Sequence, residues 1–242
     1  MAGKVKEGRA YGQGFDLAGF AELCQMNVLI IAATALELTP FAFSEEREKG
    51  IVLETMVTGV GLLSTALSLG KRMQTHPPSL VIQAGIAGAF NRKLALGQAV
   101  VVASDTIGDM GVEEDGAFKT VFEMGLADPE RFPFSGGRLI NPYHDLINQT
   151  GLTKVHGISI NEISTSPNRI HFYKDQLGGD IESMEGAALH MVCLENKIPF
   201  LQIRGISNWI GERDKSKWKI AEASEAVADV VRRLIIHLNP KA

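Results

Sequence analysis

The sequence predicts a single α/β domain in which helices flank a central mixed, mostly parallel sheet. From Met26 onward, short apolar runs typical of strands alternate with stretches of helical periodicity. A chain of 242 residues that is 45% hydrophobic can also bury one large core. Strands that alternate with crossover helices form parallel sheets, which bind ligands beyond the carboxyl ends of their strands. We therefore expect the functional residues to follow strands.

The expected elements follow from hydrophobic periodicity. Strands are expected at 28–33, 51–58, 79–84, 98–104, 154–160 and 199–206. Apolar residues recur every three or four positions at 62–73, at 226–238, and at Met184, Ala187, Ala188, Met191 and Val192, which predicts helices there. Residues 108–142 are rich in Gly, Pro and Phe without this regularity, so they could form a hairpin, a dimer contact or a lid.

Residues 1–25 stand apart from this pattern. They contain five glycines among mixed charges, and a second methionine, Met26, directly precedes the first expected strand. We expect them to be an accessory segment, either an N-terminal extension or a cloning remnant. The domain itself is expected to span 26–242.

Composition argues against several kinds of partner. The 24 Lys and Arg residues against 28 Asp and Glu give a net charge of −4, so nucleic acid is not expected. The longest apolar stretch, 28–36, is much shorter than the roughly 20 residues of a membrane span. Two cysteines, Cys24 and Cys193, are too few for a disulfide framework and suit the reducing cytoplasm, and Cys193 has the setting of a core residue. The six histidines lack metal-ligand spacing, so neither a metal nor a cofactor is expected.

Two glycine-rich segments follow expected strands, at 58–61 and at 84–88. Glycine permits positive φ and lets a ligand approach backbone N–H groups. The first segment lacks the third glycine of a dinucleotide fingerprint and has no acidic residue near position 80 to bind a ribose hydroxyl. A turn of this kind is more often a tight strand-to-helix connection than a ligand site.

Polar residues stand at three places where a strand should end or a helix begin. Glu37 follows the first expected strand. Residues 182–188, Glu-Ser-Met-Glu-Gly-Ala-Ala, place two carboxylates at the start of an apolar helix, and residues 204–209, Arg-Gly-Ile-Ser-Asn-Trp, end a strand. Each has a structural alternative, since acidic residues favour helix N-termini and Ser or Asn favour turns.

Together and in this order, these motifs resemble those of the nucleoside phosphorylase and nucleosidase superfamily over 26–238. The resemblance is closest to the futalosine hydrolase group, where Ile-Ser-Asn, here 206–208, is followed by an Arg and a Trp-x-Ile, here Arg213 and 218–220. Methylthioadenosine/S-adenosylhomocysteine nucleosidases look similar but carry Ser-Asp where this chain has Ser207 and Asn208.

The resemblance implies cleavage of the bond between ribose and a purine through an oxocarbenium-like transition state. It assigns the ribose diol to Glu185, because a carboxylate accepts from two hydroxyls and stabilises a cationic sugar. Met184 is expected to pack against the ribose, and Glu37 to activate water as a catalytic residue. Asn208 is the second expected catalytic residue. Its amide suits a 6-oxopurine such as hypoxanthine, the base of futalosine.

The remaining expectations concern the pocket wall and the far end of the substrate. Ile86, Ala87, Gly88 and Ser207 are expected to bind substrate, and residues 159–170 to contribute to the purine wall. Arg213, Arg169 or Lys217 could bind the benzoate of futalosine. Arg204 is expected to form an ion pair with a neighbouring Glu such as Glu182.

The leading interpretation is therefore a purine nucleoside N-ribosyl hydrolase that releases hypoxanthine from futalosine for menaquinone biosynthesis. A methylthioadenosine/S-adenosylhomocysteine nucleosidase is an alternative against which Asn208 argues. A phosphorylase is another, but Glu37 would repel phosphate. A non-catalytic nucleoside-binding module would not need both Glu37 and Glu185. The resemblance also implies a homodimer or a higher homo-oligomer.

Overall fold

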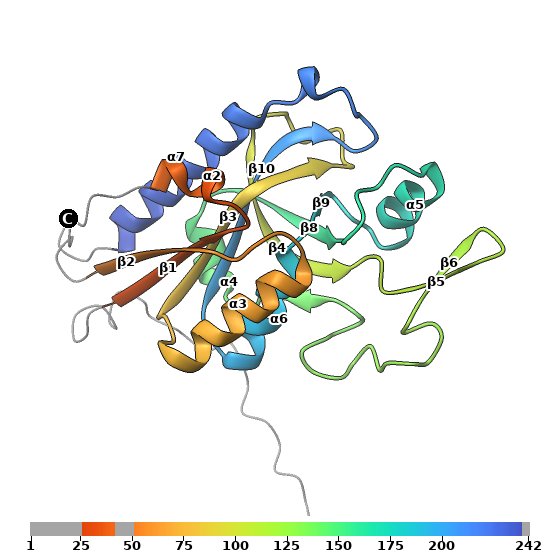
Figure 1. The fold of residues 1–242 in the computed structure, drawn as a ribbon, viewed down its shortest axis with the longest axis horizontal. Coiled ribbons are helices and arrows are strands. Elements are labelled where there is room, and N and C mark those ends of the chain that lie inside the picture. The colour runs from red at the N-terminus through yellow and green to blue at the C-terminus, as the bar shows by residue number, and fades with distance from the viewer. Residues whose placement is uncertain (1–25, 42–50, 239–242) are drawn as a thin grey trace, which may run out of the picture.

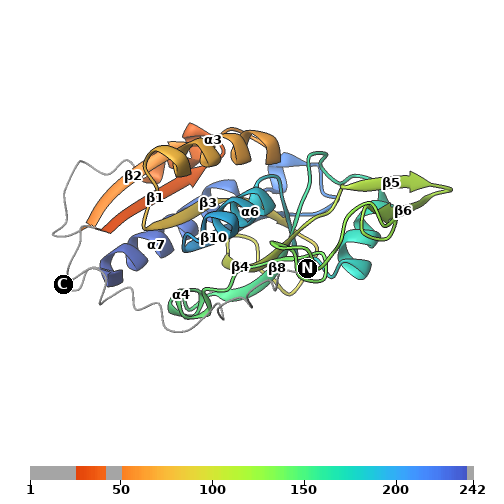
Figure 2. The ribbon, with the colours of Figure 1, turned by 90° about the horizontal axis from the view of Figure 1, so that it is seen from below.

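The computed structural model describes residues 26–41 and 51–238. They form the predicted α/β domain, with helices on both faces of one mixed sheet (Figures 1 and 2). The expected accessory segment, 1–25, lies outside the described residues. No helix in the described parts of the chain is both long and apolar enough to cross a bilayer.

The main sheet has eight strands, and five of them close into a ring because one end strand also pairs with an interior strand. Its strand order is β10-β4-β8-β9-β3-β1-β2, with β7 beside β4, and β10 also pairs with β3. Five strand pairs are parallel and three are antiparallel. The strands are β1 Met26–Ala32, β2 Ile51–Val57, β3 Leu80–Ala89, β4 Ala99–Ile107, β7 Leu139–Ile140, β8 Thr153–Ser159, β9 Ile181–Ser183 and β10 Phe200–Trp209.

Both faces of the sheet are buried at its central strands, which explains why β1 and β3 are almost continuously apolar. Along β1, Val28 and Ile30 pack into the core under α7 (Ile220–Leu238), whereas Leu29 and Ile31 face α3 (Leu62–Thr75) and α6 (Gly186–Asn196). Figure 1 shows α7 on one side of the sheet and the α3/α6 pair on the other. The expected helices are therefore confirmed.

The smaller elements surround this body. A hairpin of β5 (Gly111–Glu114) and β6 (Ala117–Thr120) projects from it beside α5 (Pro167–His171), as both ribbon views show. The irregular region 108–142 thus contains a hairpin, one of the three forms expected for it. The other elements are α2 Ala35–Leu38, α4 His144–Gln149, and the short helical turns Thr39–Phe41, Phe172–Gln176 and Lys215–Lys217.

Two local expectations were wrong. Residues 84–88 are not a turn, because β3 continues to Ala89 with hydrogen-bonded partners in both β10 and β9. Glu182 does not begin a helix but lies in β9, and α6 starts at Gly186 with Glu185 as its N-cap. Glu37 follows β1 after a short segment, as expected, and lies in α2. Cys193 is a fully buried core residue, as expected, and burial raises the pKa of its thiol.

Candidate active site

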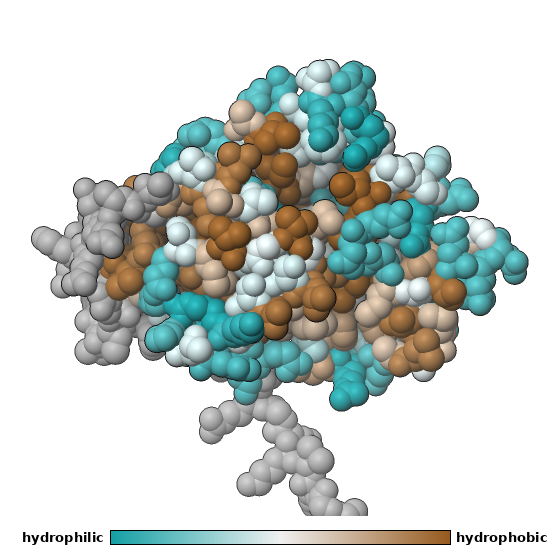
Figure 3. Space-filling view, in the orientation of Figure 1, coloured by the Kyte–Doolittle hydropathy of each residue, from teal (hydrophilic) through white to brown (hydrophobic). Residues whose placement is uncertain are grey.

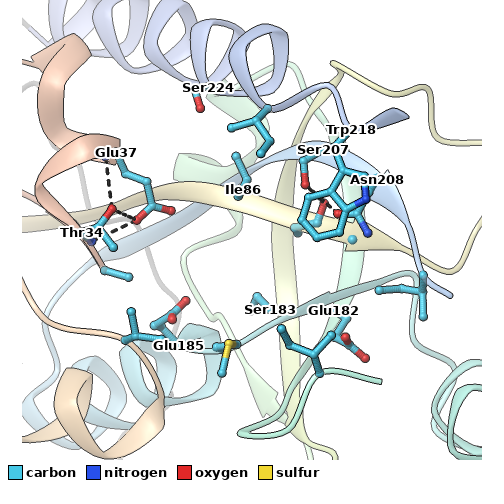
Figure 4. Close-up of a pocket in the computed structure, with 18 of the residues that line it drawn as sticks. Thr34, Glu37, Ile86, Glu182, Ser183, Glu185, Ser207, Asn208, Trp218 and Ser224 are labelled. Carbon is cyan, nitrogen blue, oxygen red and sulfur yellow. Dashed lines mark hydrogen bonds between the residues drawn. The ribbon is translucent and has the colours of Figure 1, made fainter. Parts of the chain in front are cut away.

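A cavity of about 390 Å³ opens where β1, β3, β9 and β10 end, within the size range of small-molecule sites. All eight site residues expected from the sequence line it: Glu37, Ile86, Ala87, Gly88, Met184, Glu185, Ser207 and Asn208. Other lining residues include Thr34, Val60, Ile163, Glu182, Ser183, Arg213, Trp218 and Ser224. Figure 4 shows the polar side chains pointing inward from opposite walls.

Glu37 is held in place by its own helix terminus. Its Oε2 accepts hydrogen bonds from the Thr34 N–H at 3.0 Å and the Thr34 hydroxyl at 2.9 Å, and its own N–H donates to Thr34 Oγ1. This is a capping box, for which the Thr-x-x-Glu spacing is the sequence signal. Sequence reasoning missed Thr34, although this spacing could have revealed it. One carboxylate oxygen is thereby fixed while Oε1 faces Gly85, where an added Cβ would lie 3.1 Å from it.

Glu185 and Arg204 form a buried ion pair beneath the cavity. Glu185 Oε2 lies 3.4 Å from Arg204 Nη2, and Glu185 Oε1 accepts the Gly61 N–H at 3.2 Å. The side chains are only 7% and 2% exposed, so solvent screens this attraction weakly. Gly61 has a positive φ, which turns its N–H toward the carboxylate from the loop between β2 and α3.

The expected ion pair of Arg204 with a neighbouring Glu is confirmed, but its partner is Glu185 and not Glu182, which was given as the example. The register of β10 with β3 places Arg204 beside Gly85, whereas Glu182 lies beside Gly88, further along the strand. Arg204 instead donates to Gln83 Oε1 at 2.8 Å and to the Ile86 carbonyl at 3.5 Å. A Cβ at Gly85 would lie 2.5 Å from Arg204 Nη1, so only glycine leaves room for the guanidinium.

The amide of Asn208 has a fixed orientation. The Ser207 hydroxyl donates to Asn208 Oδ1 at 2.8 Å, and Asn208 Nδ2 donates to the Trp209 carbonyl at 3.1 Å. Ser207 Oγ also lies 3.2 Å from the Ala87 carbonyl. A bulge between Ile206 and Asn208 sets Asn208 beside Gly88 of β3. The end of β10 therefore presents an amide of defined donor and acceptor geometry to the cavity.

Glu182 is a third acidic residue at this cavity, and no role was expected for it there beyond the ion pair. Its Oε1 accepts the Ser164 N–H at 3.3 Å. Burial raises the pKa of the Glu182 carboxyl, while contacts with Ser164 and the positive charge of Arg213 oppose that shift.

The three cations considered for the benzoate differ in position. Arg213 lines the cavity, with its guanidinium carbon 5.8 Å from the centre of the Trp218 ring. Arg169 instead stacks on Phe118, with its guanidinium carbon 3.8 Å from the centre of the ring. Lys217 is exposed and pairs with Glu212 at 2.8 Å. Of residues 159–170, Ile163 reaches the cavity lining.

Apolar side chains border the mouth of the cavity. Leu36 is 79% exposed and Val60 is 54% exposed, and both line the cavity. On α3, Leu63 is 81% exposed. The space-filling view shows apolar surface across the middle of this face (Figure 3).

The chain is similar to several known proteins. A family model described as the phosphorylase superfamily matches residues 38–236. Futalosine hydrolase of Thermus thermophilus is 31% identical over 209 residues, which cover 85% of this chain and 91% of that protein. A 5′-methylthioadenosine/S-adenosylhomocysteine nucleosidase of Aeromonas salmonicida is 26% identical over 210 residues, covering 84% and 89%.

Among solved structures, futalosine hydrolase of Helicobacter pylori matches with a TM-score of 0.71 at 16% identity, covering 88% of this chain and 98% of that one. This likeness concerns the fold, which is the fold that the sequence predicted. The family model spans most of the chain, and the Thermus relative extends the match to a curated protein. The chain belongs to the phosphorylase superfamily.

Proposed function

We propose that this protein hydrolyses the N-glycosidic bond of a purine nucleoside, and that its substrate is futalosine. The observation that carries the proposal is the pair Glu37 and Glu185, which lie at one cavity whose far end presents the amide of Asn208. The relatives named futalosine hydrolase support the same choice of substrate.

Glu185 binds the ribose in this proposal. Each of its oxygens has one contact, with Gly61 or with Arg204, which leaves acceptor capacity for the 2′- and 3′-hydroxyls. Its negative charge also stabilises the positive charge that develops on the sugar ring. Met184, which lines the cavity beside it, packs against the ribose.

Glu37 activates the water. The Thr34 contacts hold one carboxylate oxygen and leave Oε1 to accept a proton from water. The water oxygen bonds to the anomeric carbon as the carbon–nitrogen bond breaks, and the bond electrons leave with the base. Arg213 is the one Lys or Arg among the described cavity-lining residues, beside the carboxylates of Glu37, Glu182 and Glu185, so a phosphate dianion is a poor nucleophile here.

Asn208 recognises the base. An amide does not protonate the N7 of a leaving purine, but it donates an N–H to O6 or N7 and offers an acceptor oxygen. The rival substrates, methylthioadenosine and S-adenosylhomocysteine, carry adenine, whose 6-amino group is a donor where hypoxanthine has an acceptor. Adenine would leave buried polar groups of the site unpaired, and this cost in free energy discriminates against substrates that carry adenine.

Arg213 and Trp218 bind the benzoate of futalosine, since they line the same cavity and a guanidinium binds carboxylates well. The exposed apolar residues at the cavity mouth suit a second copy of the chain, which supports a homodimer or a higher homo-oligomer. The product would enter a bacterial menaquinone route in the cytoplasm.

The decisive experiment is product analysis with futalosine, inosine and methylthioadenosine side by side, without phosphate. We expect hypoxanthine from futalosine to be the fastest product, and added phosphate to leave its rate unchanged. Faster release of adenine from methylthioadenosine would overturn the substrate, and phosphate-dependent turnover would overturn the nucleophile.

The role of Glu37 is tested by Glu37→Gln. Loss of the general base should lower kcat about 10²- to 10⁴-fold while ligand affinity changes little. Glutamine keeps the size of the side chain and can still accept from Thr34, so the fold should survive. Equal turnover in the variant would refute the role assigned to Glu37.

A further inference from the structure

The base end of the cavity contains two buried polar atoms without hydrogen-bond partners in the described part of the chain. They are Glu182 Oε2 and Ser183 Oγ. Their residues are both 6% exposed, and both line the cavity. Leaving a buried polar atom unpaired is costly, and a charged one more so. A ligand with a polar edge at this position would supply the missing hydrogen bonds.

The strand register places Glu182 and Asn208 on either side of the same residue. Gly88 of β3 pairs with Glu182 of β9 on one side and with Asn208 of β10 on the other. Residues in register on adjacent strands project to the same face, so both side chains rise from the face on which Gly88 has none. Figure 4 shows the two side chains approaching one end of the cavity from these strands.

Gly88 leaves room for the side chain of Ile210, which lines the cavity between these two residues. A Cβ at this position would lie 2.3 Å from Ile210 Cδ1 and 3.3 Å from Asn208 Nδ2. The backbones that carry Glu182 and Asn208 are two strand spacings apart, about 10 Å. This separation suits a planar bicyclic base that forms hydrogen bonds at both edges.

We propose that Glu182 recognises the N1–H of a 6-oxopurine through its free carboxylate oxygen, while Asn208 binds the O6/N7 edge. This proposal rests on the proposed function and makes Glu182 a specificity-determining residue within it. A carboxylate has only acceptors, so it pairs with the N1–H of hypoxanthine and opposes the N1 lone pair of adenine. The Ser164 N–H holds its other oxygen. Burial raises the pKa of the Glu182 carboxyl, and the contacts with Ser164 and the charge of Arg213 oppose that shift.

The alternative partner for Glu182 would be a ribose hydroxyl. That alternative conflicts with the layout, because Glu185 lies three residues later, at the N-terminus of α6, and contacts Gly61 and Arg204. Glu182 instead contacts Ser164, in the loop expected to wall the purine. The two acids of the Glu-Ser-Met-Glu motif are therefore assigned to different parts of the substrate.

The test is calorimetric titration of the full-length chain with three free bases: hypoxanthine, 1-methylhypoxanthine and adenine. The wild-type protein should bind hypoxanthine about 10- to 100-fold more tightly than 1-methylhypoxanthine, the effect of a hydrogen bond to a charged group. In Glu182→Ala this ratio should fall close to one. In Glu182→Gln, where an amide can donate to N1, the preference for hypoxanthine over adenine should shrink.

Asp109→Asn is the matched control, because Asp109 accepts the Asn161 N–H of the same loop at 2.6 Å and is not among the cavity-lining residues. It should keep the wild-type ratio. Wild-type protein that binds both hypoxanthines equally overturns the inference even if no variant folds. A ratio unchanged in Glu182→Ala overturns it and leaves the proposed function standing. Wild-type protein that prefers adenine overturns both.

Discussion

The two ends of the cavity differ in how their carboxylates are paired. At the end with Glu37 and Glu185, backbone N–H groups of Thr34 and Gly61 and the guanidinium of Arg204 hold the carboxylates before any substrate binds. At the end with Glu182, one buried carboxylate oxygen has no hydrogen-bond partner in the described residues. The first end is preorganised for chemistry, and the second requires the base to complete it.

The strongest way to break the preorganised end is Arg204→Leu. Removing the guanidinium leaves the buried carboxylate of Glu185 without its positive partner and Gln83 Oε1 without its hydrogen-bond donor. This should lower the free energy of unfolding by about 3–5 kcal/mol. Denaturant unfolding checks this. Lys217→Ala is the control, since its pair with Glu212 is exposed and should contribute at most about 1 kcal/mol. Similar losses in both variants would contradict the buried-pair argument.

A smaller change at the same end is Gly85→Ala. The added Cβ would meet Arg204 Nη1 at 2.5 Å and Glu37 Oε1 at 3.1 Å, so it should cost about 1–3 kcal/mol of stability and also lower kcat by moving Glu37. Unfolding and turnover are measured together. Gly70→Ala in α3 meets no atom within 4 Å and should instead stabilise the protein by up to about 1 kcal/mol. An active and stable Gly85→Ala variant would show that the contact is not restrictive.

These glycines also show what sequence reasoning can and cannot reach. Periodicity predicted the strands and helices, because β1 and α7 bury their apolar residues as the pattern requires. It misassigned 84–88, since glycines that make room for the side chains of Arg204 and Ile210 have the composition of a turn. It predicted an ion pair of Arg204 with a neighbouring Glu but gave Glu182 as the example, whereas the partner is Glu185. Nearness of Glu182 to Glu185 in sequence does not reveal that strand register separates them.

For the candidate site too, the sequence predicted the residues but not their contacts. Residues within motifs, such as Glu185 and Asn208, could be named from the sequence and all line one cavity. Thr34 and the orphaned oxygen of Glu182 depend on backbone geometry and on which hydrogen bonds the fold satisfies. Motif chemistry therefore identified the groups, and the fold determined their partners.

The base end is tested by Asn208→Asp, which should change selectivity more than turnover. The carboxyl would replace the N–H that donates to the Trp209 carbonyl, so proximity to that carbonyl should favour a protonated acid able to donate to N7. The ratio of kcat/KM for methylthioadenosine to that for futalosine should rise about tenfold, or about 1.4 kcal/mol. A full reversal is not expected, because Glu182 would still oppose the N1 lone pair of adenine.

Ser207→Ala is the control, since it frees the amide without changing its chemistry and should lower kcat/KM for both substrates alike. An unchanged ratio in Asn208→Asp would mean that base selection does not depend on this amide, and a full reversal would remove the need for Glu182.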